Sequence, residues 1–140
     1  MDLATVTSYR RATTRDDLDL APGEALLAGG SWLFSVPQPE VTGLVDLTAL
    51  AWPAVEPLPG GGLRVGATCP IAAVREVGPS LMRACADALL MSFKVQAVAT
   101  LGGNLCLALP AGAMIALGAT LAGQVVVWGP GGTERRVATE

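Results

Sequence analysis

The sequence predicts an α+β fold. Short apolar segments bounded by glycine and proline, which indicate strands, are mixed with longer apolar segments, which indicate helices, and the two kinds do not alternate strictly. A disordered chain is excluded, because 51% of the residues are hydrophobic and only 15% are charged. A length of 140 residues fits one ordinary domain, or two small lobes that share a core.

The first fifty residues are expected to form one short helix and two strands. Thr13 to Leu18 predicts the helix start, because a threonine can cap free amides and acidic residues suit the positive end of a helix dipole. Pro22-Gly23 ends this helix. A short buried strand follows over 24–27, residues 31–34 open a helical turn or continue the chain, and a second strand lies within 41–47.

The middle of the chain is expected to contain a hairpin, two helices and a strand. The hairpin pairs 52–58 with 63–67 around three glycines, and the alternation of 63–67 is typical of a half-buried strand. A helix over 70–77 begins with a proline, which suits its first position, and Ser80 is expected to cap the next helix. A strand over 95–101 then leads into a pair of glycines.

The apolar run 105–122 is nearly long enough to span a membrane. Pro110 and two glycines interrupt it, so we predict a core helix over 111–122 and no membrane span. A strand over 124–128 follows, and Gly129 to Gly132 form a hairpin turn. The returning strand leaves an open edge, which predicts either a further C-terminal part or a partner that covers the edge.

Several classes of function are excluded by composition. The chain has no histidine, which removes imidazole acid–base chemistry, a Ser-His-Asp triad and most zinc sites. Its three cysteines, Cys69, Cys85 and Cys106, are too few for an iron–sulfur cluster and are typical of reduced thiols in a cytosolic protein. A net charge of −3 argues against a nucleic-acid surface. We therefore expect no catalytic side chain and no metal site in this chain, so its function rests on the backbone or on a bound group.

The glycine runs fall into two groups. Runs 60–62 and 131–132 are predicted to be surface turns. Pairs 29–30 and 102–103 each follow an apolar run and precede a small polar residue, which indicates that something approaches the backbone closely. Successive free amides there would form a nest for an anion, and two nests could hold the two phosphates of a dinucleotide. The alternative is that both pairs are tight turns or glycines packed under a helix.

Four segments together carry a family resemblance. Residues 27–33 (LAGGSWL) resemble the first flavin loop, A-G-G-T/H-D/S-L, of the FAD subunit in molybdenum hydroxylases, a family that includes xanthine dehydrogenase and the medium subunit of carbon monoxide dehydrogenase. Residues 100–105 (TLGGNL) resemble its second loop, T-I/L-G-G-N/D-L. Residues 44–47 (LVDL) and 63–68 (LRVGAT) are similar to two of its strands. The four segments follow the family's order and extend over nearly the whole chain.

The resemblance implies a two-lobed FAD-binding fold of the vanillyl-alcohol oxidase type. A small N-terminal α/β lobe would comprise 1–54, a larger lobe around an antiparallel sheet would comprise 55–140, and this chain would be C-terminally incomplete. The amides of 28–32 and 100–104 would hold the pyrophosphate, with Thr68 near the flavin. The residues implied to bind FAD are Ala28, Gly29, Gly30, Ser31, Trp32, Leu33, Thr68, Thr100, Leu101, Gly102, Gly103 and Asn104.

The chain departs from the family pattern at three places. Where the family reads S-P-A-A-D, with the acid on the FAD ribose, Ala113 stands instead of the acid. Residues 94–97 (KVQA) replace Q-V/I-R-N, and Trp32 replaces a small or acidic residue.

The function that the resemblance implies is an FAD-dependent oxidoreductase subunit. It would be active only in a cytoplasmic complex with a molybdopterin-binding large subunit and a [2Fe–2S] small subunit, and would relay electrons from the clusters through FAD to NAD or another acceptor. Two alternatives remain open: a scaffold remnant of the same fold that no longer binds FAD, favoured by Ala113 and the short chain, and an unrelated small binding domain.

Overall fold

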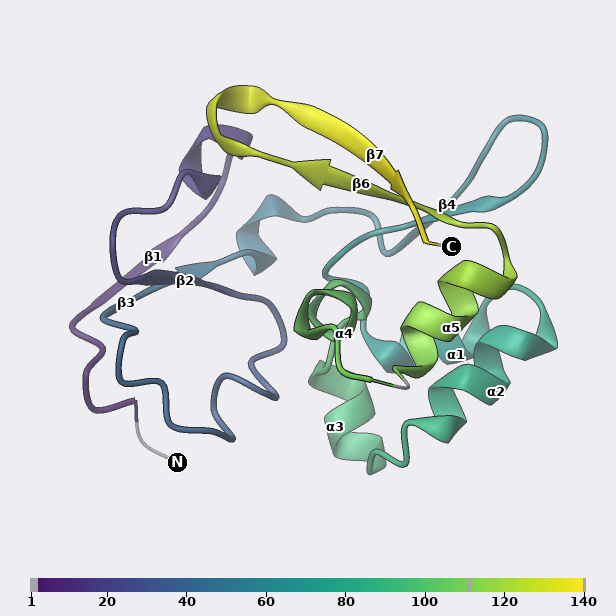
Figure 1. Cartoon of the computed structure of the whole chain (residues 1–140), viewed down its shortest axis with the longest axis horizontal. Coiled ribbons are helices and arrows are strands. Elements are labelled where there is room, and N and C mark those ends of the chain that lie inside the picture. Colours follow the sequence, from purple (N-terminus) through teal and green to yellow (C-terminus); the bar gives the residue numbers. More distant parts are fainter. Residues whose placement is uncertain (1–2, 111, 140) are drawn as a thin grey trace.

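The computed structural model describes residues 3–110 and 112–139, which form a mixed α/β fold of five helices and three small sheets (Figure 1). The strands are β1 (Ser8–Arg11), β2 (Glu24–Leu27), β3 (Gly43–Asp46), β4 (Val55–Pro57), β5 (Leu63–Val65), β6 (Gln124–Trp128) and β7 (Glu134–Ala138). The helices are α1 (Ile71–Glu76), α2 (Ser80–Ala88), α3 (Phe93–Val98), α4 (Leu101–Leu107) and α5 (Ala113–Thr120). Short 3₁₀ turns are η1 (Arg15–Leu18), η2 (Thr48–Leu50) and η3 (Pro130–Gly132).

The N-terminal sheet is parallel, with strand order β1-β3-β2. Every residue of the central strand β3 is buried, and its last residue, Asp46, is a buried carboxylate. Arg11 and Leu27 both pair with Asp46, so the three strands end at the same edge. The segments that follow β2 and β3 therefore start side by side, and the predicted strands 24–27 and 41–47 are confirmed.

The predicted helix after β1 is a single 3₁₀ turn, η1. The Asp17 carboxylate accepts hydrogen bonds from the amides of Thr13 and Thr14, each at 2.8 Å, and these bonds lower the pKa of Asp17 to about 2. Residues 31–35 form a turn and no regular helix.

The main core lies among the helices. Its buried residues are Cys69, Ile71, Val74, Met82, Ala86, Ala99, Met114 and Leu117. The predicted helix beginning at Ser80 is present as α2, but Ser80 is its first residue and Pro79 occupies the cap position. Pro70 likewise caps α1 and does not form its first turn.

The strand predicted over 95–101 is wrong, because this stretch belongs to α3 and α4 (Figure 1). Ser92 caps α3 by accepting a hydrogen bond from the Val95 amide, and Thr100 caps α4 in the same way. Between them Ala99 is extended and 3% exposed, and its carbonyl accepts a hydrogen bond from Ile71 at 2.8 Å. Caps and tertiary packing thus override the strand preference of the valines.

The core helix predicted over 111–122 is confirmed as α5, with Ala111 outside the described residues. Met114 and Leu117 are its buried side chains. None of the helices in the described part of the chain combines the length and apolarity needed to cross a membrane. Both predicted hairpins, β4–β5 and β6–β7, are present and antiparallel.

The β6–β7 hairpin extends across the molecule, and its tip lies over η1 (Figure 1). The guanidinium of Arg15 lies 4.5 Å from the centre of the Trp128 ring and donates a hydrogen bond to the Thr133 carbonyl at 2.5 Å. Trp52 packs edge-on against Trp128, with ring centres 5.4 Å apart. These contacts join the N-terminal sheet to the remainder of the fold.

Candidate functional site

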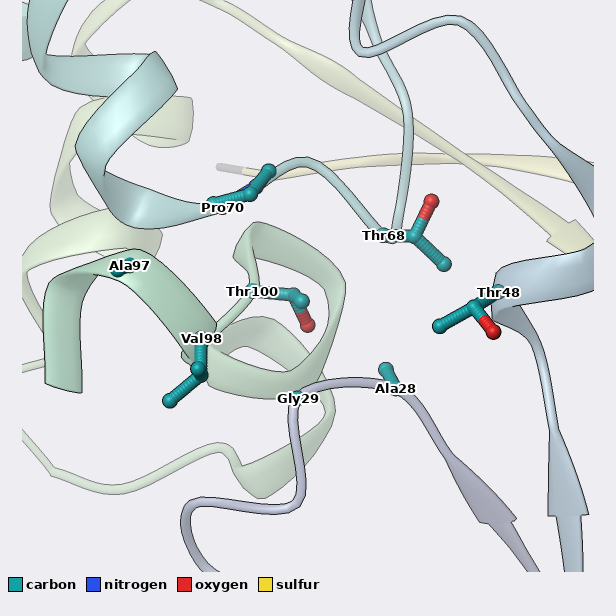
Figure 2. Close-up of a pocket in the computed structure, with 8 residues that line it drawn as sticks. All are labelled: Ala28, Gly29, Thr48, Thr68, Pro70, Ala97, Val98 and Thr100. Atoms are coloured by element: carbon teal, nitrogen blue, oxygen red, sulfur yellow. The ribbon is translucent and has the colours of Figure 1, made fainter. Parts of the chain in front are cut away.

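Three of the four motif segments, 27–33, 63–68 and 100–105, line one cavity, and the fourth, 44–47, ends one residue before its lining residue Thr48. The cavity has a volume of about 260 Å³ and lies between the carboxyl edge of the parallel sheet and the region where α3 ends and α4 begins (Figure 2). The residues that line it are Ala28, Gly29, Thr48, Thr68, Pro70, Ala97, Val98 and Thr100. All of these side chains are small and none is charged.

The sequence-predicted site residues divide into two sets. Ala28, Gly29, Thr68 and Thr100 line the cavity. The remaining ones belong to the same segments without lining it: Gly30, Ser31, Trp32, Leu33, Leu101, Gly102, Gly103 and Asn104.

The first glycine segment presents free backbone amides. Among the described residues, no acceptor is found for the amides of Gly29 to Leu33. The carbonyl groups of this turn, unlike its amides, are hydrogen-bonded: the Phe34 amide donates to the Gly30 carbonyl at 2.9 Å, and the Ser35 hydroxyl donates to the Ser31 carbonyl. A row of unpaired amides in a turn can bind an anion through its N–H dipoles.

Gly29 is closely approached, as its sequence context predicts, but by this chain's own backbone. A Cβ atom at Gly29 would overlap the carbonyl oxygen of Val98 at the end of α3. Gly30 has a φ of +67°, and a Cβ there would meet the ring of Phe34. Gly29 therefore lets the turn pack under α3, and Gly30 leaves room for the Phe34 ring.

The second glycine segment differs from the prediction, because it forms the first turn of α4. The Leu101 and Gly102 amides donate to the carbonyls of Cys69 and Ala67, both at 2.9 Å. The amides of Gly103 and Asn104 donate to the Thr100 hydroxyl at 3.1 Å and to the Thr100 carbonyl at 3.0 Å. Four amides assigned by resemblance to a pyrophosphate thus already have acceptors, two in the Thr100 cap and two in the carbonyls of Ala67 and Cys69.

The second segment has two further polar groups, the Thr100 side chain and the Asn104 amide oxygen. Thr100 lines the cavity and is 6% exposed. The Oδ1 atom of Asn104 is buried and has no hydrogen-bond partner within residues 3–110 and 112–139. A buried acceptor without a hydrogen-bond partner destabilises the fold, so the Asn104 oxygen is suited to accept a hydrogen bond from a bound ligand.

Thr48 is a lining residue that the sequence reading missed. It follows β3 at the edge where Ala28 follows β2. The signal was present, because the carboxyl ends of parallel strands meet at the same edge and ligands commonly bind there.

The other glycine runs form surface turns, as predicted. Gly60, Gly61 and Gly62 have φ values of +87°, +98° and +90°, and a Cβ on any of them would meet nothing within 4 Å. The same open surroundings are found at 131–132. In the described ranges, no group of three or more histidine, cysteine, aspartate or glutamate side chains is placed to hold a metal ion. Cys69 is buried, Cys85 is half-buried and Cys106 is exposed, and all three are free thiols.

A family described as "FAD binding domain in molybdopterin dehydrogenase" matches residues 5–140. Among solved structures, the chain is similar to carbon monoxide dehydrogenase from Hydrogenophaga pseudoflava lacking the Mo-pyranopterin moiety of its cofactor, with a TM-score of 0.78 and 21% identity over 96% of this chain and 50% of that chain. It is also similar to reconstituted CO dehydrogenase from Oligotropha carboxidovorans (TM-score 0.79, 23% identity, 96% and 50% covered). Quinoline 2-oxidoreductase from Pseudomonas putida 86 gives a TM-score of 0.66 at 24% identity (94% and 50% covered).

No match is found among curated protein sequences. At these identities the structural likeness establishes the fold, and the chain spans about half the length of the solved chains that it matches.

Proposed function

The chain belongs to the family of FAD-binding domains in molybdopterin dehydrogenases, and from this we propose that it binds FAD beside the cavity at the edge of the parallel sheet. The observation that carries the proposal is the row of free amides from Gly29 to Leu33, which begins at a cavity lined by three of the four motif segments. These amides would hold the pyrophosphate of FAD, since no charged side chain lines the cavity to neutralise it.

Side chains complete this proposed site. Thr68 and Thr100 line the cavity, and the buried Oδ1 atom of Asn104 offers an acceptor to a ligand donor. The second segment would contribute through these groups and less through its amides, which have acceptors within the chain.

When bound, FAD supplies redox chemistry, while the protein supplies binding and orientation. We place the chain in a flavin subunit that relays electrons from iron–sulfur clusters to NAD or another acceptor. Its partners would be a molybdopterin-binding large subunit and a [2Fe–2S] small subunit in the cytoplasm. The similarity to two CO dehydrogenases and a quinoline oxidoreductase supports the flavin-subunit proposal. The three free thiols support the proposed cytoplasmic location, where thiols stay reduced.

The proposed fold is the two-lobed vanillyl-alcohol oxidase type, with lobes over 1–54 and 55–140. The parallel sheet lies within the first range, and the helices with both hairpins lie in the second.

The alternative is a scaffold remnant of this fold that no longer binds FAD. Ala113 stands where the family has an acid, and four amides of the second segment are occupied. Loss of FAD binding with an intact fold would favour this alternative.

The test is FAD titration of the full-length protein, followed by flavin absorbance and fluorescence. We expect a yellow protein, and binding that weakens about tenfold or more in Ser31→Pro, because this change removes one amide donor to a charged group. Ser31→Ala is the matched control, since it keeps the amide and removes only the hydroxyl. A colourless protein that takes up no added FAD, while circular dichroism shows the native fold, would contradict the proposal.

A further inference from the structure

The tip of the β6–β7 hairpin contacts η1 through one cation and one aromatic ring. The Arg15 guanidinium lies over the Trp128 ring and donates a hydrogen bond to the Thr133 carbonyl. Glu134 completes the contact, because its Oε2 atom accepts a hydrogen bond from Trp128 Nε1 at 3.0 Å and lies 3.9 Å from Arg15 Nη1. We call these four residues the hairpin clasp, since together they join η1 to the hairpin tip.

The η1 side of the clasp is bound to the strand that leads into the first glycine segment. Arg10 of β1 donates hydrogen bonds to the carbonyls of Asp17 and Asp19, at 2.6 and 3.2 Å, and so holds η1 on the parallel sheet. The same guanidinium pairs with Glu24 of β2 at 2.8 Å. Ala28, a lining residue of the cavity, follows β2 directly, so a movement of η1 is transmitted to this edge of the cavity.

The hairpin side of the clasp is bound to the helices. The base of the hairpin is fixed at the end of α5, where the amide and the hydroxyl of Thr139 donate to the Gly123 carbonyl at 3.1 and 2.9 Å. α5 packs against α2 and α4, and Thr100, which lines the cavity, caps α4. The hairpin therefore crosses from the helices that form one wall of the cavity to η1, beside the sheet that forms the other (Figure 1).

The proposed FAD site needs both walls. Ala28, Gly29 and Thr48 line the cavity from the side of the sheet, whereas its other lining residues fall within 68–100. The free amides that begin at Gly29 belong to the sheet side, and the Thr100 side chain belongs to the helix side. A ligand that contacts both walls loses part of its contacts when they separate, so its apparent affinity depends on the fraction of molecules with the walls in place.

The contact between η1 and the hairpin tip is loosely packed. A second cavity, of about 320 Å³, lies at this contact, and its lining residues Leu20, Leu26 and Trp128 remain 44%, 46% and 42% exposed. The buried Nε atom of Arg15 has no hydrogen-bond partner among residues 3–110 and 112–139, which weakens the contact further. Sparse apolar packing is typical of a region that opens locally while the rest of the fold stays intact.

We propose that Arg15 and Trp128 are positioning residues of the FAD site, which hold its sheet wall and its helix wall at the spacing that FAD requires. Neither residue lines the first cavity, so both act through this spacing. Opening of the clasp weakens FAD binding, and bound FAD keeps the clasp closed by the same factor, because the two equilibria are linked. The inference rests on the proposed FAD binding and adds the element that regulates it.

The first experiment measures FAD affinity in the full-length protein after the clasp is broken. Arg15→Ala and Trp128→Ala should each weaken FAD binding about fivefold, the effect of losing one partly exposed cation–ring contact. The double variant should also bind about fivefold more weakly, because both changes remove the same contact. Arg75→Ala is the matched control and should stay within about twofold of the parent, since Arg75 pairs with Glu76 and Asp87 among the helices alone.

The second experiment separates positioning from general stabilisation by hydrogen exchange. In the clasp the Gly129 amide donates to the Thr133 carbonyl at 3.0 Å, and in the β4–β5 turn the Gly61 amide donates to the Leu58 carbonyl at 3.1 Å. Saturating FAD should slow exchange at Gly129 about fivefold, the factor by which breaking the clasp weakens binding, and should leave Gly61 unchanged. Equal slowing at both turns, or no slowing at Gly129, would overturn the inference.

The two proposals fail in different ways. A parent protein that binds no FAD overturns the proposed function, and the role of the clasp with it. If the parent binds FAD and Arg15→Ala binds it equally well, the FAD site stands and the clasp plays no part in it. The same conclusion follows if Arg75→Ala weakens FAD binding as much as Arg15→Ala does.

Discussion

The two glycine pairs have nearly the same local sequence and opposite backbone chemistry. Gly29-Gly30 lies in a turn after a parallel strand, and the amides from Gly29 to Leu33 have no acceptor in the described part of the chain. Gly102-Gly103 lies in the first turn of α4, and its amides donate to Ala67 and to Thr100. The first pair is suited to bind an anion, whereas the second pair lets α4 start close to its neighbours.

The glycines themselves serve close packing at both places. Gly29 lies against the backbone of Val98, and Gly102 lies against the backbone of Ala67. The absence of a side chain at a motif glycine therefore shows that something approaches, but the partner can be the chain itself.

The largest effect is expected for Gly29→Ala. The new Cβ would overlap the Val98 carbonyl oxygen, so the end of α3 must move away from the turn. We expect a loss of about 3 kcal/mol in the free energy of unfolding, as for a severe overpacked site. Urea denaturation followed by circular dichroism measures it, and an unchanged midpoint would show that the turn does not pack under α3.

Alanine substitution should destabilise the fold more at Gly102 than at Gly103. A Cβ at Gly102 would lie 2.6 Å from the Ala67 carbonyl oxygen, whereas a Cβ at Gly103 would meet only the Thr100 hydroxyl, at 3.0 Å. Gly102→Ala should cost about 2 kcal/mol. Gly103→Ala should stay within about 1 kcal/mol of the parent, since alanine also favours the helix. Equal urea midpoints for the two variants would contradict this packing.

Thr100→Val tests the cap that occupies an amide of the second pair. It removes the hydroxyl that accepts from the Gly103 amide at 3.1 Å and should cost about 1 kcal/mol of unfolding free energy. Thr100→Ser keeps the hydroxyl and serves as the control. Identical thermal unfolding of the two variants would mean that α4 does not depend on this cap.

The smallest expected effect is a loss of stability at low pH. It should arise at Glu24, in the strand that precedes Gly29-Gly30. Arg10 donates two hydrogen bonds of 2.8 Å to Glu24 at the start of β2, and the Ala21 amide donates a third, which together lower the pKa of Glu24 to about 2 from its ordinary 4.5. A lowered carboxyl pKa stabilises the fold above the unfolded-state value, and this stability is lost as the pH falls from about 4.5 toward 2. Residues 93–107, around the second pair, contain no acidic residue.

Urea midpoints measured across this pH range provide the test. The midpoint of the parent protein should fall more steeply than that of Glu24→Gln, because only the parent loses an ionised partner for Arg10. Parallel curves for the two proteins would rule out a stabilising Glu24 carboxylate.

Much of the fold was predictable because its signals are local. The strand 24–27 is bounded by glycines, the hairpins surround glycine turns, and the core helix α5 follows a proline and a glycine. The stretch 95–101 was not predictable in this way, since a short apolar run fits a buried strand or a helix equally well. Its helical state depends on Ser92 and Thr100 as caps and on the packing of Ala99 against α1.

The candidate site shows the same division. The motif segments identified Ala28, Gly29, Thr68 and Thr100, which the fold brings to one cavity. Thr48 was missed: the end of a strand at 41–47 indicated where to look, but only the parallel register of β2 and β3 places Thr48 beside Ala28.

The sequence by itself determined where side chains must be absent, where strands turn back and which segments belong to the family's flavin motifs. Only the tertiary structure decided which backbone amides stay free. The reason is that an amide is occupied or free according to acceptors far along the chain: Leu101 and Gly102 find Cys69 and Ala67 through packing of α4, whereas the amides after Gly29 lie at an open sheet edge without such neighbours.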